Sequence, residues 1–114
     1  MPNSELDLTT FEELKQMSGA DFIDELVDTF LEDAPKLLGD MKSALQSGDA
    51  ESFRRAAHSL KSNSATFGAS HLSALAKELE MLGKENKLGE VGNRLQAAET
   101  TYQSVANELK GLRK

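Results

Sequence analysis

The chain has 114 residues, no cysteine, and a net charge of −6 from 19 acidic and 13 basic residues. A chain of this length is expected to form one domain with a sizeable core, and the lack of cysteine excludes disulfides, thiolate metal sites and a cysteine nucleophile. The negative charge and the absence of tryptophan disfavour nucleic acid and anionic lipid as ligands, so protein partners are expected.

The N-terminal segment, residues 1–7, shows no helical pattern and is expected to be flexible, with a helical domain over residues 8–114. It carries neither the basic nor the apolar region of a secretory leader. No apolar run approaches the ~20 residues that span a bilayer. We therefore expect a cytoplasmic, monomeric protein without membrane insertion.

Apolar residues recur at helical spacing along most of the chain, and no strand alternation occurs. A short first helix is predicted from Thr10 to Met17, with Thr9 as N-cap and Gly19 just past its end.

The second predicted helix runs from about residue 21 to residue 47 and contains Pro35. Proline removes a backbone hydrogen bond and kinks or splits a helix. The apolar stripe nevertheless keeps its phase across Pro35, which favours one kinked helix over two. That stripe consists of Ile23, Val27, Phe30, Ala34, Leu37, Met41 and Leu45.

The third predicted helix follows Gly48, is capped by Asp49 and stops at Gly68. The fourth is capped by Ser70 and closed by Gly83. The core face of the third helix consists of Phe53, Ala57, Leu60, Ser64 and Phe67. The stripe of the fourth consists of Leu72, Leu75, Leu79 and Leu82.

A polar, glycine-bounded loop over residues 83–90 precedes the last predicted helix. The stripe of that helix consists of Val91, Leu95, Ala98, Tyr102, Val105, Leu109 and Leu112. Four long amphipathic helices joined by short turns predict an all-α fold. We expect an antiparallel four-helix bundle with a short additional N-terminal helix.

His58 lies on the face of the third helix that points away from the core. The outward face consists of Arg54, His58, Lys61, Ser62 and Ala65. A neutral imidazole on a rigid helix, beside cations and small side chains, suits a nucleophile that accepts a phosphoryl group. Lys61 would pair with the phosphate oxygens. Geometry alone leaves open the commoner alternative, a solvated surface histidine.

Other features of the sequence carry less chemistry. His71, at the start of the fourth helix, has no partner ligands at metal-binding spacing and is interpreted as a surface residue. Neither GxGxxG nor GxxxxGK[ST] occurs, so the chain is not expected to bind ATP or to phosphorylate itself. No resident metal or cofactor is expected.

The stretch "HSLKSNSATFG", from His58 to Gly68, resembles the signature of histidine-containing phosphotransfer (HPt) domains. That signature is roughly H-x-L-K-G, followed by a glycine six residues later. The flanking "GDAESFRRAA" and "ASHLSALAKELE", and the earlier "FLEDAPKLLGDMKSALQSGD", are also similar to the family, so the resemblance extends from about Leu8 to Leu112. Ser62 departs from the usual glycine, but it is small, and function is expected to be retained.

The resemblance implies a phosphorelay intermediate of two-component signalling. His58 would accept a phosphoryl group from a receiver-domain aspartate, on the ring nitrogen farther from the backbone, and pass it to another receiver. Lys61 would stabilise the phosphate, and the receiver would hold the Mg²⁺. The chain could be free-standing or part of a hybrid kinase, which would associate it with a membrane.

The resemblance also assigns roles to neighbouring residues. The docking face for receivers would consist of Arg54, Arg55, Ser62 and Ala65, and structural roles fall to Leu60, Phe67 and Gly68. Glu80 stands where the family often has a glutamine near the imidazole. A carboxylate there would favour a protonated ring and oppose a bound phosphate. Two alternatives stay open: a receiver-docking helical adaptor without phosphotransfer, and an unrelated four-helix adaptor.

Overall fold

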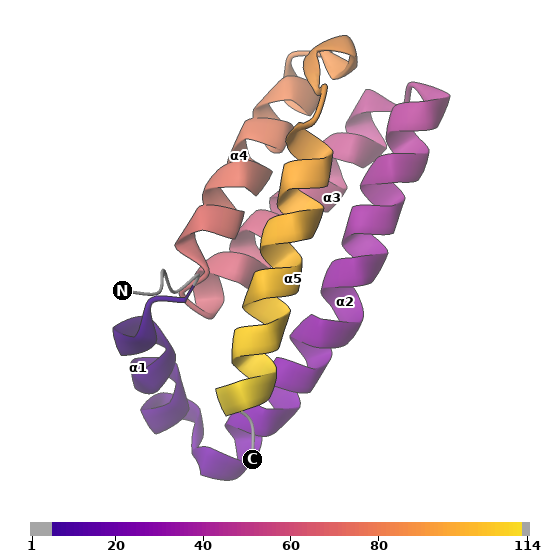
Figure 1. Cartoon of the computed structure of the whole chain (residues 1–114). Coiled ribbons are helices and arrows are strands. Elements are labelled where there is room, and N and C mark those ends of the chain that lie inside the picture. Colours follow the sequence, from indigo (N-terminus) through magenta and orange to yellow (C-terminus); the bar gives the residue numbers. More distant parts are fainter. Residues whose placement is uncertain (1–5, 113–114) are drawn as a thin grey trace.

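The computed structural model describes residues 6–112, and the regular secondary structure of these residues is entirely helical, as predicted. Helices α2 to α5 run alongside one another as a bundle, and α1 packs across one end (Figure 1). The predicted all-α bundle with a short N-terminal helix is therefore confirmed. Its elements are α1 (Leu8–Ser18), α2 (Ala20–Ser47), α3 (Ala50–Thr66), α4 (Ser70–Lys84), the 3-10 helix η1 (Leu88–Glu90) and α5 (Arg94–Leu112). Within the described residues, no helix combines the length and the apolar character needed to cross a membrane.

Helix α2 continues without a break through Pro35, which confirms the single predicted helix. Because proline has no N–H, the carbonyl of Leu31, four residues earlier, loses its usual helical donor. The hydroxyl of Tyr102 on α5 donates to this carbonyl at 3.3 Å. A side chain from another helix thus satisfies the acceptor that Pro35 leaves open.

The core follows the predicted stripes with shifts of one residue, except that Leu112, predicted in the stripe of the last helix, is exposed. Aromatic packing joins three helices, because the Phe30 ring centroid lies 5.2 Å from that of Phe67 and 5.9 Å from that of Tyr102. In α2 the fully buried leucine is Leu38, while Leu37 is only partly buried. Met41, three residues further on, is fully buried as predicted, so the buried stripe stays on one face at about 3.6 residues per turn.

The predicted cap of α1 is wrong, because Asp7 and not Thr9 occupies the N-cap. The Asp7 carboxylate accepts from the backbone N–H of Thr9 at 3.0 Å and of Thr10 at 3.3 Å. Leu6 is buried, and the Asp7 N–H donates to the carbonyl of Gly68 at 2.7 Å. The fold therefore begins at Leu6, within the tail predicted to be flexible, whereas residues 1–5 lie outside the described residues.

The cap of α3 is as predicted, since the Asp49 carboxylate accepts from the backbone N–H of Ser52 at 3.1 Å. The predicted Ser70 cap of α4 is wrong. Ser70 is already helical, and Ala69 occupies the N-cap without a side-chain hydrogen bond. Ala69 is buried beside the turn at Gly68, whose φ is +79°. The chain enters α4 by this buried turn instead of by a side-chain cap.

Gly83 does not end α4 as predicted, because the helix continues to Lys84 and turns at Asn86, where φ is +58°. Gly83 is instead buried where α4 crosses α3. A Cβ on Gly83 would lie 3.1 Å from the backbone of Arg54. The glycine is thus explained by a close approach of two helices. The last helix also begins later than predicted, at Arg94, after Val91 and η1.

Candidate functional site

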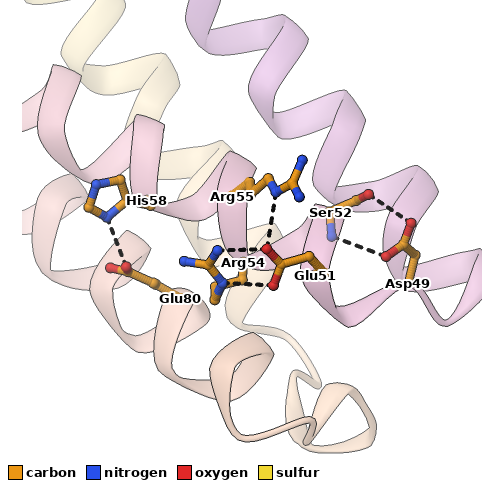
Figure 2. Close-up of polar contacts among 7 residues, drawn as sticks. All are labelled: Asp49, Glu51, Ser52, Arg54, Arg55, His58 and Glu80. Atoms are coloured by element: carbon orange, nitrogen blue, oxygen red, sulfur yellow. Dashed lines mark hydrogen bonds and ion pairs between the residues drawn. The ribbon is translucent and has the colours of Figure 1, made fainter.

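The candidate site lies where α3 and α4, the most extensively packed pair of helices, run side by side. His58 is in the middle of α3, and its side chain is 54% exposed. Its Nδ1 atom lies 2.8 Å from Oε2 of Glu80 on α4. Figure 2 shows the two side chains pointing toward each other. The predicted outward orientation of His58 therefore agrees with the structure, and Glu80 does face the ring.

Glu80 binds two partners at once. Its Oε1 atom lies 2.7 Å from Nζ of Lys61, so one carboxylate contacts both His58 and Lys61. The Glu80 side chain is only 14% exposed. The hydrogen bond from Lys61 is the main cause that lowers the pKa of Glu80; partial burial opposes this shift, and the bond to His58 adds to it. Glu80 is therefore an ionised carboxylate at neutral pH.

The contact with Glu80 fixes the tautomer of His58. An ionised carboxylate can only accept hydrogen bonds, so Nδ1 must carry the proton and donate it. In a neutral ring the lone pair then resides on Nε2. No residue in the range 6–112 forms a hydrogen bond with Nε2. The site presents an exposed imidazole nitrogen with a free lone pair, which is the form of histidine that acts as a nucleophile.

Two further contacts hold α3 and α4 in register at this site. The Ser73 hydroxyl donates to the backbone carbonyl of Lys61 at 3.1 Å. Gly83, three residues after Glu80, brings the backbone of α4 against Arg54, four residues before His58. Since three or four residues make one helical turn, the Gly83 contact lies about one turn from the Glu80–His58 pair on each helix. The Ser73 contact lies about one turn from the pair on α3 and two turns from it on α4. Ser73 was not singled out in the sequence, and Gly83 was predicted only as the end of α4.

Arg54 and Arg55, predicted as part of the docking face, are both paired with Glu51. The Nη2 atom of Arg54 lies 2.7 Å from the Glu51 carboxylate, and Nε of Arg55 lies 3.1 Å from it (Figure 2). The hydrogen bonds from these arginines, that of Arg54 first, lower the pKa of Glu51 to about 2. The positive charge around His58 is therefore more compensated than the cluster of basic residues in the sequence indicates, because Lys61 also has an acidic partner.

The remaining predicted site residues divide into surface and core. Ser62 and Ala65 are exposed on α3 on the side of His58, whereas Leu60 and Phe67 are buried. Gly68 has a φ of +79°, and a Cβ there would lie 2.8 Å from the carbonyl oxygen of Asp7. This position requires glycine both for its backbone conformation and for the approach of the N-terminal segment.

The second histidine, His71, is exposed at the start of α4, as predicted. Across residues 6–112, no three His, Cys, Asp or Glu side chains are placed to hold a metal ion. A hollow of about 490 Å³ lies between α2 and α3 around Ser43 and Ser59, and its lining includes neither His58 nor Glu80. The site at His58 is thus an open surface and not an enclosed pocket.

Comparison with known proteins agrees with this arrangement. The model of the Hpt domain family matches residues 25–113. The fold is similar to the crystal structure of histidine-containing phosphotransfer protein B (HptB) from Pseudomonas aeruginosa PAO1, with a TM-score of 0.92 and 30% sequence identity over 98% of this chain and 96% of that chain. Among curated proteins, no sequence matches significantly. The chain belongs to the Hpt domain family, the histidine phosphotransfer proteins of two-component signalling.

Proposed function

We propose that His58 is the phosphoacceptor of a phosphorelay, taking a phosphoryl group from a receiver-domain aspartate and passing it to another receiver. The observation that carries this proposal is the geometry of the ring. Nδ1 is occupied by Glu80 at 2.8 Å, and the 54% exposed side chain keeps Nε2 accessible to a partner. Nε2 is also the nitrogen farther from the backbone.

The transfer needs no base on this chain. The lone pair of Nε2 attacks phosphorus, the bond between phosphorus and the aspartyl oxygen breaks, and its electron pair returns to the carboxylate of the receiver. The ring becomes an imidazolium that carries the phosphoryl group on Nε2 and keeps its proton on Nδ1, next to Glu80. The helix supplies a fixed position for the nucleophile. Onward transfer to a second aspartate is the reverse of the same step.

The receiver is proposed to dock on the exposed part of α3 around His58. Ser62 and Ala65 are small and exposed there, so a partner can approach the ring closely. Arg54 and Arg55 lie one turn before His58. The ammonium group of Lys61 is bound to Oε1 of Glu80, and it would have to leave this oxygen to contact an incoming phosphoryl group. The Mg²⁺ that the transfer needs would be held by the acidic pocket of the receiver.

The decisive experiment compares His58→Gln with His71→Gln, since these are the two histidines of the chain. After incubation with a phosphorylated receiver, wild type and His71→Gln should take up label, and His58→Gln should take up none. Both substitutions are at exposed positions, so stability should change by only about 0.5 kcal/mol. Label on His58→Gln would refute the assignment. Receiver binding without transfer to the wild-type chain would instead identify a docking adaptor.

A further inference from the structure

We propose that the Glu80 carboxylate keeps phosphorylated His58 protonated on Nδ1 and thereby makes its phosphoryl group labile, so that the domain passes the group on quickly and stores it poorly. This inference deepens the proposed function and rests on His58 being the phosphoacceptor. Glu80 is a positioning residue in this scheme, because it acts on the imidazole and not on phosphorus.

The lability follows from the leaving group. When Nδ1 carries a proton, cleavage of the bond between phosphorus and Nε2 returns the electron pair to Nε2 and releases a neutral imidazole. When Nδ1 has lost its proton, the same cleavage must release an imidazolate anion, a much poorer leaving group. In hydrolysis, the oxygen of water bonds to phosphorus, the protons of water stay with the inorganic phosphate, and Nδ1 keeps its own. The protonation state of Nδ1 therefore sets the lifetime of the phosphoryl group.

The structure determines which protonation state is favoured. A carboxylate at 2.8 Å from Nδ1 accepts a hydrogen bond and offers none, so it stabilises only the ring that is protonated on Nδ1. A glutamine amide at the same place could rotate and donate to an unprotonated Nδ1 as well as accept from a protonated one. The carboxylate of Glu80 thus stabilises the phosphorylated ring only when Nδ1 is protonated, which is the labile form. A glutamine amide would stabilise the protonated and the unprotonated ring.

Lys61 supports this role by holding the carboxylate in place and ionised. Its ammonium lies 2.7 Å from Oε1, leaving Oε2 directed at the ring. The other charges near the ring are those of Arg54 and Arg55 on α3, which are paired with Glu51. On α4, Lys77 and Lys84 lie one turn to either side of Glu80 and are exposed. Glu80 is therefore the acid that contacts Nδ1 directly, and the nearby acid Glu51 is engaged by the two arginines.

The test measures the hydrolysis of phospho-His58 as a function of pH in wild type and in Glu80→Gln. Each protein is phosphorylated with phosphoramidate, from which Nε2 displaces ammonia, and the loss of phosphohistidine is followed by ³¹P NMR. At acidic pH both rings are protonated, and the two rates should agree. Toward alkaline pH, Glu80→Gln should hydrolyse more slowly, by up to about tenfold if the midpoint of its profile falls by about one unit.

Glu78→Gln is the matched control, because Glu78 is an exposed acid on the same helix and lies 3.9 Å from Arg94, away from His58. Its hydrolysis profile should coincide with that of wild type. Equal profiles for Glu80→Gln and wild type would overturn the proposal, and so would faster hydrolysis in Glu80→Gln. Failure of the proposed function would look different, since phosphohistidine would then form in none of the proteins or would persist in His58→Gln.

Discussion

Replacing Ser64 by alanine should stabilise the domain, although it removes a polar side chain from the motif helix. The Ser64 hydroxyl is fully buried and has no hydrogen-bond partner among residues 6–112. An unsatisfied buried hydroxyl costs about 1–3 kcal/mol, and alanine gains ~0.5 kcal/mol in helix propensity over serine. Some packing of the oxygen atom is lost in return. We expect a net gain of about 1–2 kcal/mol, equivalent to roughly 4–8 °C in melting temperature.

Urea unfolding followed by far-UV circular dichroism measures this difference directly. Ser62→Ala is the control, because Ser62 lies on the same helix but is exposed, so it should gain only the ~0.5 kcal/mol of helix propensity. Ser64→Ala should be clearly more stable than Ser62→Ala. A Ser64→Ala domain less stable than wild type would show that the hydroxyl makes a favourable hydrogen bond, and the reasoning would be refuted.

Two further changes test the fold and the docking face. Tyr102→Phe should destabilise the domain by about 1 kcal/mol, because the Leu31 carbonyl loses its donor. In a Pro35→Ala background, where the helix regains its own N–H, the same change should cost less, and equal losses in a double-mutant cycle would contradict this account. Ser62→Tyr should keep the melting temperature and impair receiver binding, measured by calorimetric titration, whereas Ser104→Tyr on the exposed side of α5 should bind normally.

The helices could be predicted from the sequence because their burial pattern is local. Every stripe at helical spacing corresponds to a helix, and the unbroken phase across Pro35 correctly indicated one helix. The errors occur where a local signal competes with a tertiary contact. Glycine is typical of helix ends, but Gly83 lies inside α4, where it allows the helix to pack closely against the backbone of Arg54. Asp7 caps α1 because Leu6 and Gly68 hold the preceding chain in place.

The site shows the same division. The outward orientation of His58 and Ser62 could be predicted from a helical wheel, because the apolar residues of α3 define the face that is buried and these two residues lie on the opposite face. The compensation of Arg54 and Arg55 by Glu51 was missed, although their spacing of three and four residues is that of ion-pairing neighbours on a helix. The positions of Glu51, Arg54 and Arg55 in the sequence therefore carry the signal for both ion pairs.

Glu80 could not be placed by any pattern within α3, because its contact with His58 depends on the register of two helices. That register is fixed by Gly83 and Ser73, two residues that do not contact the imidazole ring. Gly83 lets the backbones approach, and the Ser73 hydroxyl binds the carbonyl of Lys61 at 3.1 Å. A bulkier residue at position 83 would separate the helices one turn from Glu80 and lengthen the contact that fixes the tautomer of His58. The tautomer of the ring is therefore set from α4, by positions that lie outside the motif surrounding the histidine.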